Sequence, residues 1–163
     1  MKISTQSRYA IRMLLELSLQ ENDTQRLTAQ QIALRQGISE KYLESIATKL
    51  QKGGFLHSSK GFGGGYRLAL APAEIRLGDI MRLMETNFFA SHCVKDPEKN
   101  CKHFTDCITY EYLCQIEQTL SQEANSISIN DLRNRYHERK KSSLKPSEYN
   151  CCCSVDVDME DVI

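Results

Sequence analysis

The stretch "LTAQQIALRQGISEKYLESIATKLQKGGFLHSSKGFGGGYRLALAP", residues 27–72, constrains the fold of this chain more than any other part. Thr28 and Gln31 have the spacing of a capping box, which predicts that a short helix begins there. Gly37 can end this helix in the left-handed conformation, and Ser39 can cap the next one. Two short helices joined by such a turn form a helix-turn-helix, although an ordinary helical hairpin would show the same pattern.

The second of these helices is predicted from about Glu40 to Lys52. Its apolar residues recur at helical spacing, so they should share one buried face. The inward residues predicted for the two helices are Ile32, Ala33, Leu43, Ile46, Ala47 and Leu50.

Two short strands are predicted next, at Phe55–Ser58 and Tyr66–Leu70, around the turn "KGFGGG". Glycine adopts positive φ in a tight hairpin without steric cost. The turn lacks the Gly-Lys-Ser/Thr ending of a phosphate loop and joins strand to strand. We therefore interpret it as a wing that carries Lys60 and Arg67 beside the helix-turn-helix. The predicted fold class is mainly α with a small β-hairpin wing, a winged helix-turn-helix.

Helices are also predicted on both sides of this unit. Before it, "TQSRYAIRMLLELSLQEN" has helical periodicity with Ser4 or Thr5 as a cap. After it come Leu77–Met84, buried through Ile80, Leu83 and Met84, a helix from Thr105 onward, and a short helix from about Asn130 to Arg139. The helix from Thr105 has apolar residues every four positions, which is typical of a core face or a dimer seam. These residues are Ile108, Tyr112, Ile116 and Leu120.

These elements predict a division of the chain into four parts. Residues 1–86 form the winged helix-turn-helix and residues 87–108 a cysteine-bearing loop. Residues 105–139 form a long dimerisation helix with the short last helix. Residues 140–163 are expected to be a largely disordered, acidic, cysteine-containing tail, because their composition gives them little to bury.

Charge is unevenly distributed, although the whole chain has a formal net charge of zero. Residues 1–70 carry ten lysines and arginines against five acids, a net charge of +5. Such a surplus suits a nucleic-acid partner, because basic groups displace counterions from phosphates; a solvated basic surface is the alternative. No apolar run is long enough to span a bilayer and no secretion signal is visible, so a cytoplasmic location is expected. No nucleophile–base pair or paired carboxylates indicate an enzyme.

The stretch "CVKDPEKNCKHFTDC" contains Cys93, Cys101 and Cys107, and no cysteine precedes it. The residues between these thiols are too polar to form a core. In a reducing compartment, such cysteines indicate metal ligands or redox thiols before disulfides.

Together, "RYAIRMLLELS", "IALRQGISEKYLESIATKLQKGGFL", "KGFGGGYRLA" and the cysteine loop resemble the IscR/NsrR/CymR-type winged-helix transcriptional regulators of bacteria. The resemblance covers roughly residues 1–135. It implies a homodimer that binds a double-stranded DNA operator. Several members of the family hold an iron–sulfur cluster through three loop cysteines, and the cluster sets DNA affinity; others lack these cysteines and respond to protein partners.

The resemblance assigns DNA contacts to two elements of this chain. Residues at the start of the family's recognition helix correspond here to Ser39, Lys41, Tyr42, Glu44 and Ser45. Glutamate can accept a hydrogen bond from cytosine, serine can meet either base, and lysine can meet phosphate. A solvated helix residue is the alternative for Glu44. Lys60 matches a wing position where IscR-like members have arginine in a narrow minor groove. Lysine fits that potential but lacks the planar fork.

The resemblance also implies that Cys93, Cys101 and Cys107 bind the iron–sulfur cluster, since thiolates suit iron. The fourth ligand departs from both family patterns, because Tyr110 replaces the histidine of IscR types and Arg8 replaces the aspartate of NsrR types. His103 is the nearest substitute, and an exposed loop imidazole is its equal alternative. The gap of seven residues between the first two cysteines favours a [4Fe–4S] over a [2Fe–2S] cluster.

Four further cysteines follow the loop. Cys114 lies too far along a helix from Cys107 to share a compact cluster, which leaves it as a core or seam residue. Cys151, Cys152 and Cys153 could supply a ligand or bind copper or zinc, but a functionless reactive tail is the first interpretation. Two alternatives to a cluster sensor remain open: a regulator with a structural zinc, and a metal-free one controlled by thiol oxidation or a protein partner.

Overall fold

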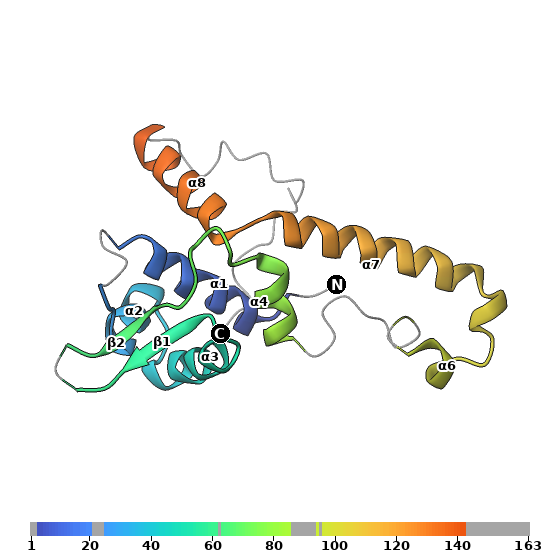
Figure 1. The fold of residues 1–163 in the computed structure, drawn as a ribbon, viewed down its shortest axis with the longest axis horizontal. Helices are drawn as coiled ribbons and strands as arrows, with labels where there is room; N and C mark the ends of the chain where they lie inside the picture. Colours follow the sequence, from blue (N-terminus) through green and yellow to red (C-terminus); the bar gives the residue numbers. More distant parts are fainter. Residues whose placement is uncertain (1–2, 21–24, 62, 86–93, 95, 143–163) are drawn as a thin grey trace, which may run out of the picture.

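The computed structural model describes residues 3–20, 25–61, 63–85, 94 and 96–142, which form a winged helix with a long projecting helix (Figure 1). Helices α1 to α4 and the β1–β2 hairpin make the winged helix, α7 projects from it, and α8 packs against α1. The bounds are α1 Thr5–Ser18, α2 Ala29–Gln36, α3 Glu40–Lys52, β1 Leu56–Ser59, β2 Gly65–Leu68, α4 Leu77–Met84, α6 Pro97–Asn100, the 3₁₀ helix η1 Phe104–Asp106, α7 Ile108–Ser126 and α8 Ile129–Ser142.

One hydrophobic core joins α1, α2, α3, α4 and the start of α8. The apolar residues predicted to face inward on α2 and α3 are all buried, as the helical spacing requires. Ile129, at the start of α8, completes this core and is fully buried. Its backbone N–H donates to the carbonyl of Ile75 at 2.9 Å. The core of the winged helix therefore includes a residue 61 positions after Leu68, the end of its last strand.

The helix ends form as the sequence predicts. Thr28 and Gln31 make both hydrogen bonds of the capping box, and Gly37 ends α2 with φ of 66°. The Ser39 side chain accepts from the N–H of Tyr42 and so caps α3. These local contacts set the turn between α2 and α3 and confirm the helix-turn-helix.

The hairpin is antiparallel, with Leu56 opposite Leu68 and Ser59 opposite Gly65. β1 begins and ends one residue later than predicted, and β2 begins one residue earlier and ends two residues earlier. The glycine turn sets where strand pairing can begin. Gly65 has φ of 141°, and a Cβ there would lie 2.6 Å from the carbonyl oxygen of Leu27. That close approach lets Tyr66 exchange two backbone hydrogen bonds with Leu27 just before α2, which ties the hairpin to the helix-turn-helix.

A polar network fixes α7 to α4. Arg82 of α4 donates to Asp79 and to the side-chain oxygen of Asn125 of α7, each at 2.7 Å. Gly78 leaves room for this approach, since a Cβ there would lie 2.1 Å from Asn125 Oδ1. The C-terminal half of α7 is thereby held against the winged helix, while its other half extends beyond it (Figure 1).

Several sequence predictions need correction. The long helix begins at Ile108 and not at Thr105, because a 3₁₀ turn occupies Phe104–Asp106. On α4 Leu83 is half-buried, whereas Met81 is buried. The last helix runs to Ser142, so residues 140–142 are helical and not part of a disordered tail. The rest of that tail lies outside the described residues. Among those described, no helix has the length and apolar character to cross a membrane.

Candidate nucleic-acid interface and cysteine loop

The start of α3 presents a polar, exposed surface. Lys41, Glu44 and Ser45 are exposed there, on the side opposite the buried residues of the same helix. Ser39 is exposed at the N-cap, where its oxygen is engaged by the backbone of α3. Ser45 donates to the Tyr42 carbonyl at 2.7 Å, so its oxygen remains available as an acceptor. The predicted residues are thus gathered on one turn and a half of helix.

Tyr42 differs from its neighbours because it is half-buried and packs back onto α1. Its ring meets that of Tyr9 edge to face, with centroids 6.0 Å apart. The guanidinium of Arg12 lies 5.5 Å from the centroid of Tyr9. Sequence reasoning did not assign Tyr9 or Arg12 to this surface. The sequence pattern that could have pointed to them is the four-residue spacing of Arg8 and Arg12, which places two cations on one side of α1.

The hairpin lies beside α3. Lys60 is exposed at the end of β1, and Tyr66 of β2 lies near the carboxylates of α3. Burial, together with the charges of Glu44 and Glu40, raises the pKa of Tyr66, so its hydroxyl stays protonated at neutral pH. The charges of Glu40 and Glu44 on α3 therefore act on Tyr66 of the wing.

A carboxylate ties the start of α1 to the end of α4. Glu85 Oε1 accepts from the Ser4 N–H and from the Ser7 hydroxyl, both at 2.7 Å. Partial burial alone would raise the pKa of Glu85, but the hydrogen bonds from Ser7 and Ser4 outweigh it and lower the pKa below the ordinary value. Glu85 is the last described residue before residues 86–93, so the contact fixes the point from which the chain leaves toward Cys93.

Two of the three loop cysteines are described, and Cys93 lies outside the described residues. Cys101 follows the short helix α6, and Cys107 follows η1 at the N-cap of α7. Both are half-buried free thiols on extended backbone. His103 is exposed between them, at the start of η1. Within the part of the chain that the structure describes, no three histidine, cysteine or acidic side chains converge into a metal site.

Cys114 shares a cavity with Cys107. The hollow, of about 700 Å³, lies along the first half of α7 and η1. Phe104 and Tyr110 form its aromatic wall, with ring centroids 5.9 Å apart. Cys114 is half-buried and lies about 180° around the helix from the middle of the apolar stripe of α7. It is therefore neither a fully buried core residue nor part of that stripe.

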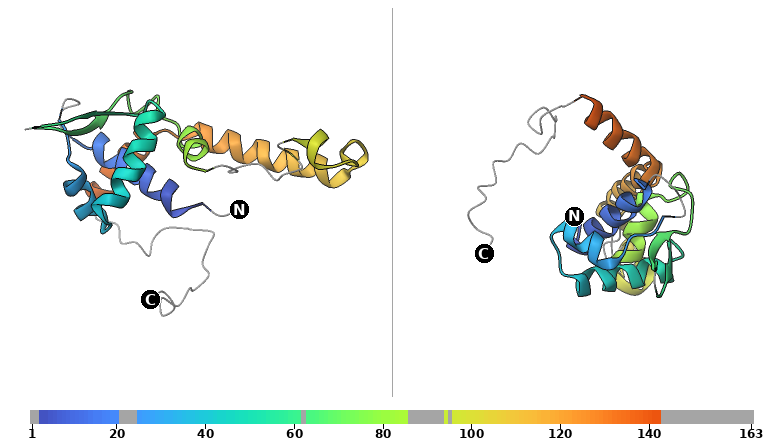
Figure 2. Two further views of the ribbon diagram at one scale, coloured as in Figure 1. Left: turned by 90° about the horizontal axis from the view of Figure 1, so that it is seen from below. Right: turned by 90° about the vertical axis from the view of Figure 1, so that its left-hand side faces the viewer.

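The described part of the cysteine loop, with α6 and η1, lies at the end of α7 that is remote from the winged helix (Figure 2). The 19 residues of α7 span about 28 Å at 1.5 Å per residue. The stripe along this helix is exposed: Ile108 by 72%, Tyr112 by 62% and Ile116 by 55%. Three large apolar side chains lie on one helix face, and no element among the described residues covers them, which indicates a surface for another protein.

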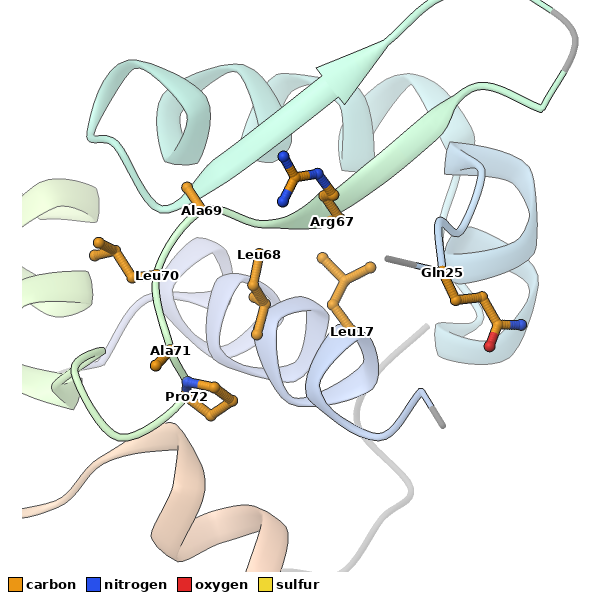
Figure 3. Close-up of a pocket in the computed structure, with 8 residues that line it drawn as sticks. All are labelled: Leu17, Gln25, Arg67, Leu68, Ala69, Leu70, Ala71 and Pro72. Atoms are coloured by element: carbon orange, nitrogen blue, oxygen red, sulfur yellow. The ribbon is translucent and has the colours of Figure 1, made fainter. Parts of the chain in front are cut away.

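A separate small hollow lies where the hairpin joins the domain (Figure 3). It measures about 270 Å³ and is formed by Leu17 of α1, Leu68 of β2 and the segment up to Pro72, with Gln25 and Arg67 beside it. Its lining contains none of the predicted DNA-contacting residues and none of the described cysteines. It is therefore not part of the predicted site.

Comparison with known proteins agrees with this arrangement. Residues 3–135 match the family Rrf2, described as "Iron-dependent Transcriptional regulator". The chain is 33% identical over 132 residues to the HTH-type transcriptional regulator IscR of Aliivibrio salmonicida, covering 81% of this chain and 77% of that protein. Among solved structures, CymR, the global cysteine regulator of B. subtilis, superposes with a TM-score of 0.66 at 26% identity over 83% of this chain and 98% of CymR.

The IscR structure from T. potens gives a TM-score of 0.61 at 26% identity, covering 89% of this chain and 93% of that one. The relatives are regulators of transcription and not enzymes. The family match, the fold and the exposed polar start of α3 agree with one another. The chain therefore belongs to the Rrf2 family of DNA-binding, winged-helix transcriptional regulators.

Proposed function

We propose that this protein is a homodimeric transcriptional regulator whose affinity for its DNA operator is set by an iron–sulfur cluster bound by Cys93, Cys101 and Cys107. The observation that carries the DNA-binding part is the exposed polar turn at the start of α3 beside a glycine-rich wing. A recognition helix of this kind enters the major groove with its N-terminal residues against the base edges.

The roles of the surface residues follow from their chemistry. Glu44 accepts a hydrogen bond from a cytosine amine, and Ser45 and Ser39 contact bases or phosphates. Lys41 meets the phosphate backbone, while Lys60 of the wing enters the negative potential of a narrow minor groove. Tyr42, which packs on Tyr9, positions this end of α3 and has only its outer edge left for DNA.

The Glu44 assignment predicts a change of specificity. Glu44→Ala should relax the preference at one base pair by about 1–3 kcal/mol and leave the preferences at other positions intact. An operator is first selected from a random DNA library with the unmodified protein, and binding to single-base variants is then followed by fluorescence anisotropy. Gln51→Ala, at the exposed far end of the same helix, is the matched control and should change nothing. An unchanged base preference in Glu44→Ala would contradict the proposed base contact and show that Glu44 is a solvated surface residue.

The exposed stripe of α7 supports the homodimer. A second copy of the helix can cover Ile108, Tyr112 and Ile116, and burial of their apolar surface favours association. A dimer presents two recognition helices, which read half-sites about one helical turn of DNA apart.

The described cysteines fit an iron–sulfur cluster. Cys101 and Cys107 are free, half-buried thiols on non-helical backbone, which lets them turn toward a common ligand. Cys107 also lies at the N-cap of the 19-residue helix α7, so a ligand bound there would lie directly at the end of that helix. His103 is the proposed fourth ligand, and a [4Fe–4S] cluster is favoured by the longer first gap between cysteines.

When bound, such a cluster would react with oxygen or nitric oxide and would be lost when iron is scarce, which side chains alone do not do. The chain's own part is transmission. Cys107 directly precedes α7, α7 is joined to α4 through Asn125 and Arg82, and α4 packs against α1 and α3. A displacement of the cysteine loop would therefore move α7, and through its contacts with α4 it would shift the position of α3.

The cluster assignment is tested by the visible spectrum and the iron and sulfide content of protein purified without oxygen. A broad charge-transfer absorption is expected, with four irons per chain for the larger cluster. Cys101→Ala and Cys107→Ala should abolish it, whereas Cys114→Ala, the matched control on the same helix face as Cys107, should retain it. Protein that is colourless with one zinc per chain, under conditions that preserve clusters, would contradict the cluster and leave the fold assignment intact.

A cluster-free regulator controlled by thiol oxidation, a structural zinc or a protein partner is the second candidate. It is favoured by the cavity that Cys107 and Cys114 share, because two thiols in one accessible hollow suit a redox role. Retention of normal DNA binding by metal-free protein, with loss on mild peroxide treatment, would support it.

A further inference from the structure

The last helix carries a positive charge that the proposed DNA-binding face does not use. Over its 14 residues α8 has five lysines and arginines against two acids, a net charge of +3. In both Figures 1 and 2, α8 lies across α1 from α3, on the other side of the winged helix. A DNA duplex seated on α3 therefore leaves α8 uncovered.

A groove of about 490 Å³ runs between α8 and the end of α1. Its α8 wall combines an aromatic ring with cations: Lys140 Nζ lies 4.9 Å from the centroid of Tyr136, and His137 lies edge to face with the same ring. The opposite wall includes Leu19 and Arg35, which is ion-paired with Glu16. The groove is therefore mostly polar, with Leu19 and the ring of Tyr136 as its apolar parts and Lys140 as a cation that has no acidic partner among its lining side chains.

The chain itself contains a segment of matching chemistry. Residues 154–163, "SVDVDMEDVI", carry four acids and no base, and valine, methionine and isoleucine alternate with the acids. Eleven residues, 143–153, connect this segment to the end of α8, and a coil of that length has a root-mean-square span of about 18 Å. Tyr136 and Lys140 lie within about 9 Å of the end of the helix at 1.5 Å per residue. The segment therefore reaches the groove at a high effective concentration.

We propose that residues 154–163 dock in the groove between α1 and α8 of the same chain. The carboxylates lie against Lys140 and the neighbouring cations of α8, and the valines lie against Leu19 and Tyr136. The docked segment neutralises the basic surface of α8 and competes with phosphates for it. It thereby suppresses non-specific DNA binding through the face opposite α3, a consequence that rests on the proposed DNA-binding function.

The test uses the full chain under reducing conditions with a neutralised segment, Asp156→Asn/Asp158→Asn/Glu160→Gln/Asp161→Asn. Amide resonances of Tyr136, His137 and Lys140 are expected to shift relative to the unmodified protein, while those of Lys41 and Glu44 stay in place. Glu148→Gln, which removes an acid from the connecting residues, is the matched control and should leave all of these resonances unchanged.

The same variant should bind random-sequence DNA about 3- to 10-fold more tightly at ~50 mM salt, with a steeper salt dependence, and Lys140→Gln should reverse part of this gain. Resonances on α8 that stay unchanged would overturn the docking, as would shifts confined to α3 or shifts that disappear on dilution. Because the resonance test contains no DNA, its outcome is independent of the proposed function. Shifts on α8 with unchanged affinity for random DNA would overturn the competition and leave the docking standing.

Discussion

Leu43→Ala is expected to lower the free energy of unfolding by about 2–5 kcal/mol, because it leaves a cavity in a closely packed core. Leu43 is fully buried on the inner face of α3, among Ile32, Ile46 and Leu50. The loss is a large fraction of the stability of a domain of this size. Urea denaturation followed by circular dichroism measures it, read as a lower midpoint at constant slope.

Leu34→Ala provides the matched control in the same helix-turn-helix. The Leu34 side chain is 83% exposed on α2, so its truncation should change the free energy of unfolding by about 0.5 kcal/mol or less. Equal effects of the two substitutions would contradict the orientation of α2 and α3 described above.

Ile116→Glu is expected to convert the proposed dimer to a monomer. Ile116 lies in the exposed stripe of α7, where a buried carboxylate would meet the apolar stripe of the second copy without a partner. A monomer reaches only one half-site, so operator affinity should fall on the order of 100-fold or more, which corresponds to about 2.7 kcal/mol. Analytical ultracentrifugation gives the oligomeric state, and anisotropy gives the affinity.

Gln122→Glu adds the same charge to the same helix about 120° away from Ile116 and should preserve both the dimer and operator binding. The fold of the Ile116→Glu chain should remain intact, since the side chain is 55% exposed in the single chain. A dimer that persists in Ile116→Glu would place the interface elsewhere.

Features that depend on near neighbours could be predicted from the sequence. The capping box at Thr28, the left-handed Gly37 and the cap at Ser39 all involve residues no more than four positions apart, and all three form as predicted. The same holds for α3, whose bounds match the prediction because a cap starts it and glycines follow it. The exposed residues at the start of the helix follow from the helical spacing of its apolar residues, because these bury one face and leave the opposite face to solvent.

Features that join distant parts of the chain could not be predicted. The burial of Ile129 against Ile75, the contact of Glu85 with Ser4 and Ser7, and the packing of Tyr42 on Tyr9 link residues 33 to 81 positions apart. No local pattern specifies such partners, because many pairings satisfy the same periodicity. The 3₁₀ turn before α7 escaped prediction for a related reason, since the apolar spacing does not distinguish it from a first helical turn.

The sequence by itself determined the winged helix-turn-helix, the order of its elements and the residues at the start of α3, because caps, glycines and apolar spacing act over a few residues. Only the tertiary structure decided that the start of α8 closes the core, that the stripe of α7 is exposed, and that α6 and η1, with the cysteines that follow them, lie at the end of α7 remote from the winged helix. These facts depend on which surfaces remain once every helix has packed, and that is a property of the whole chain.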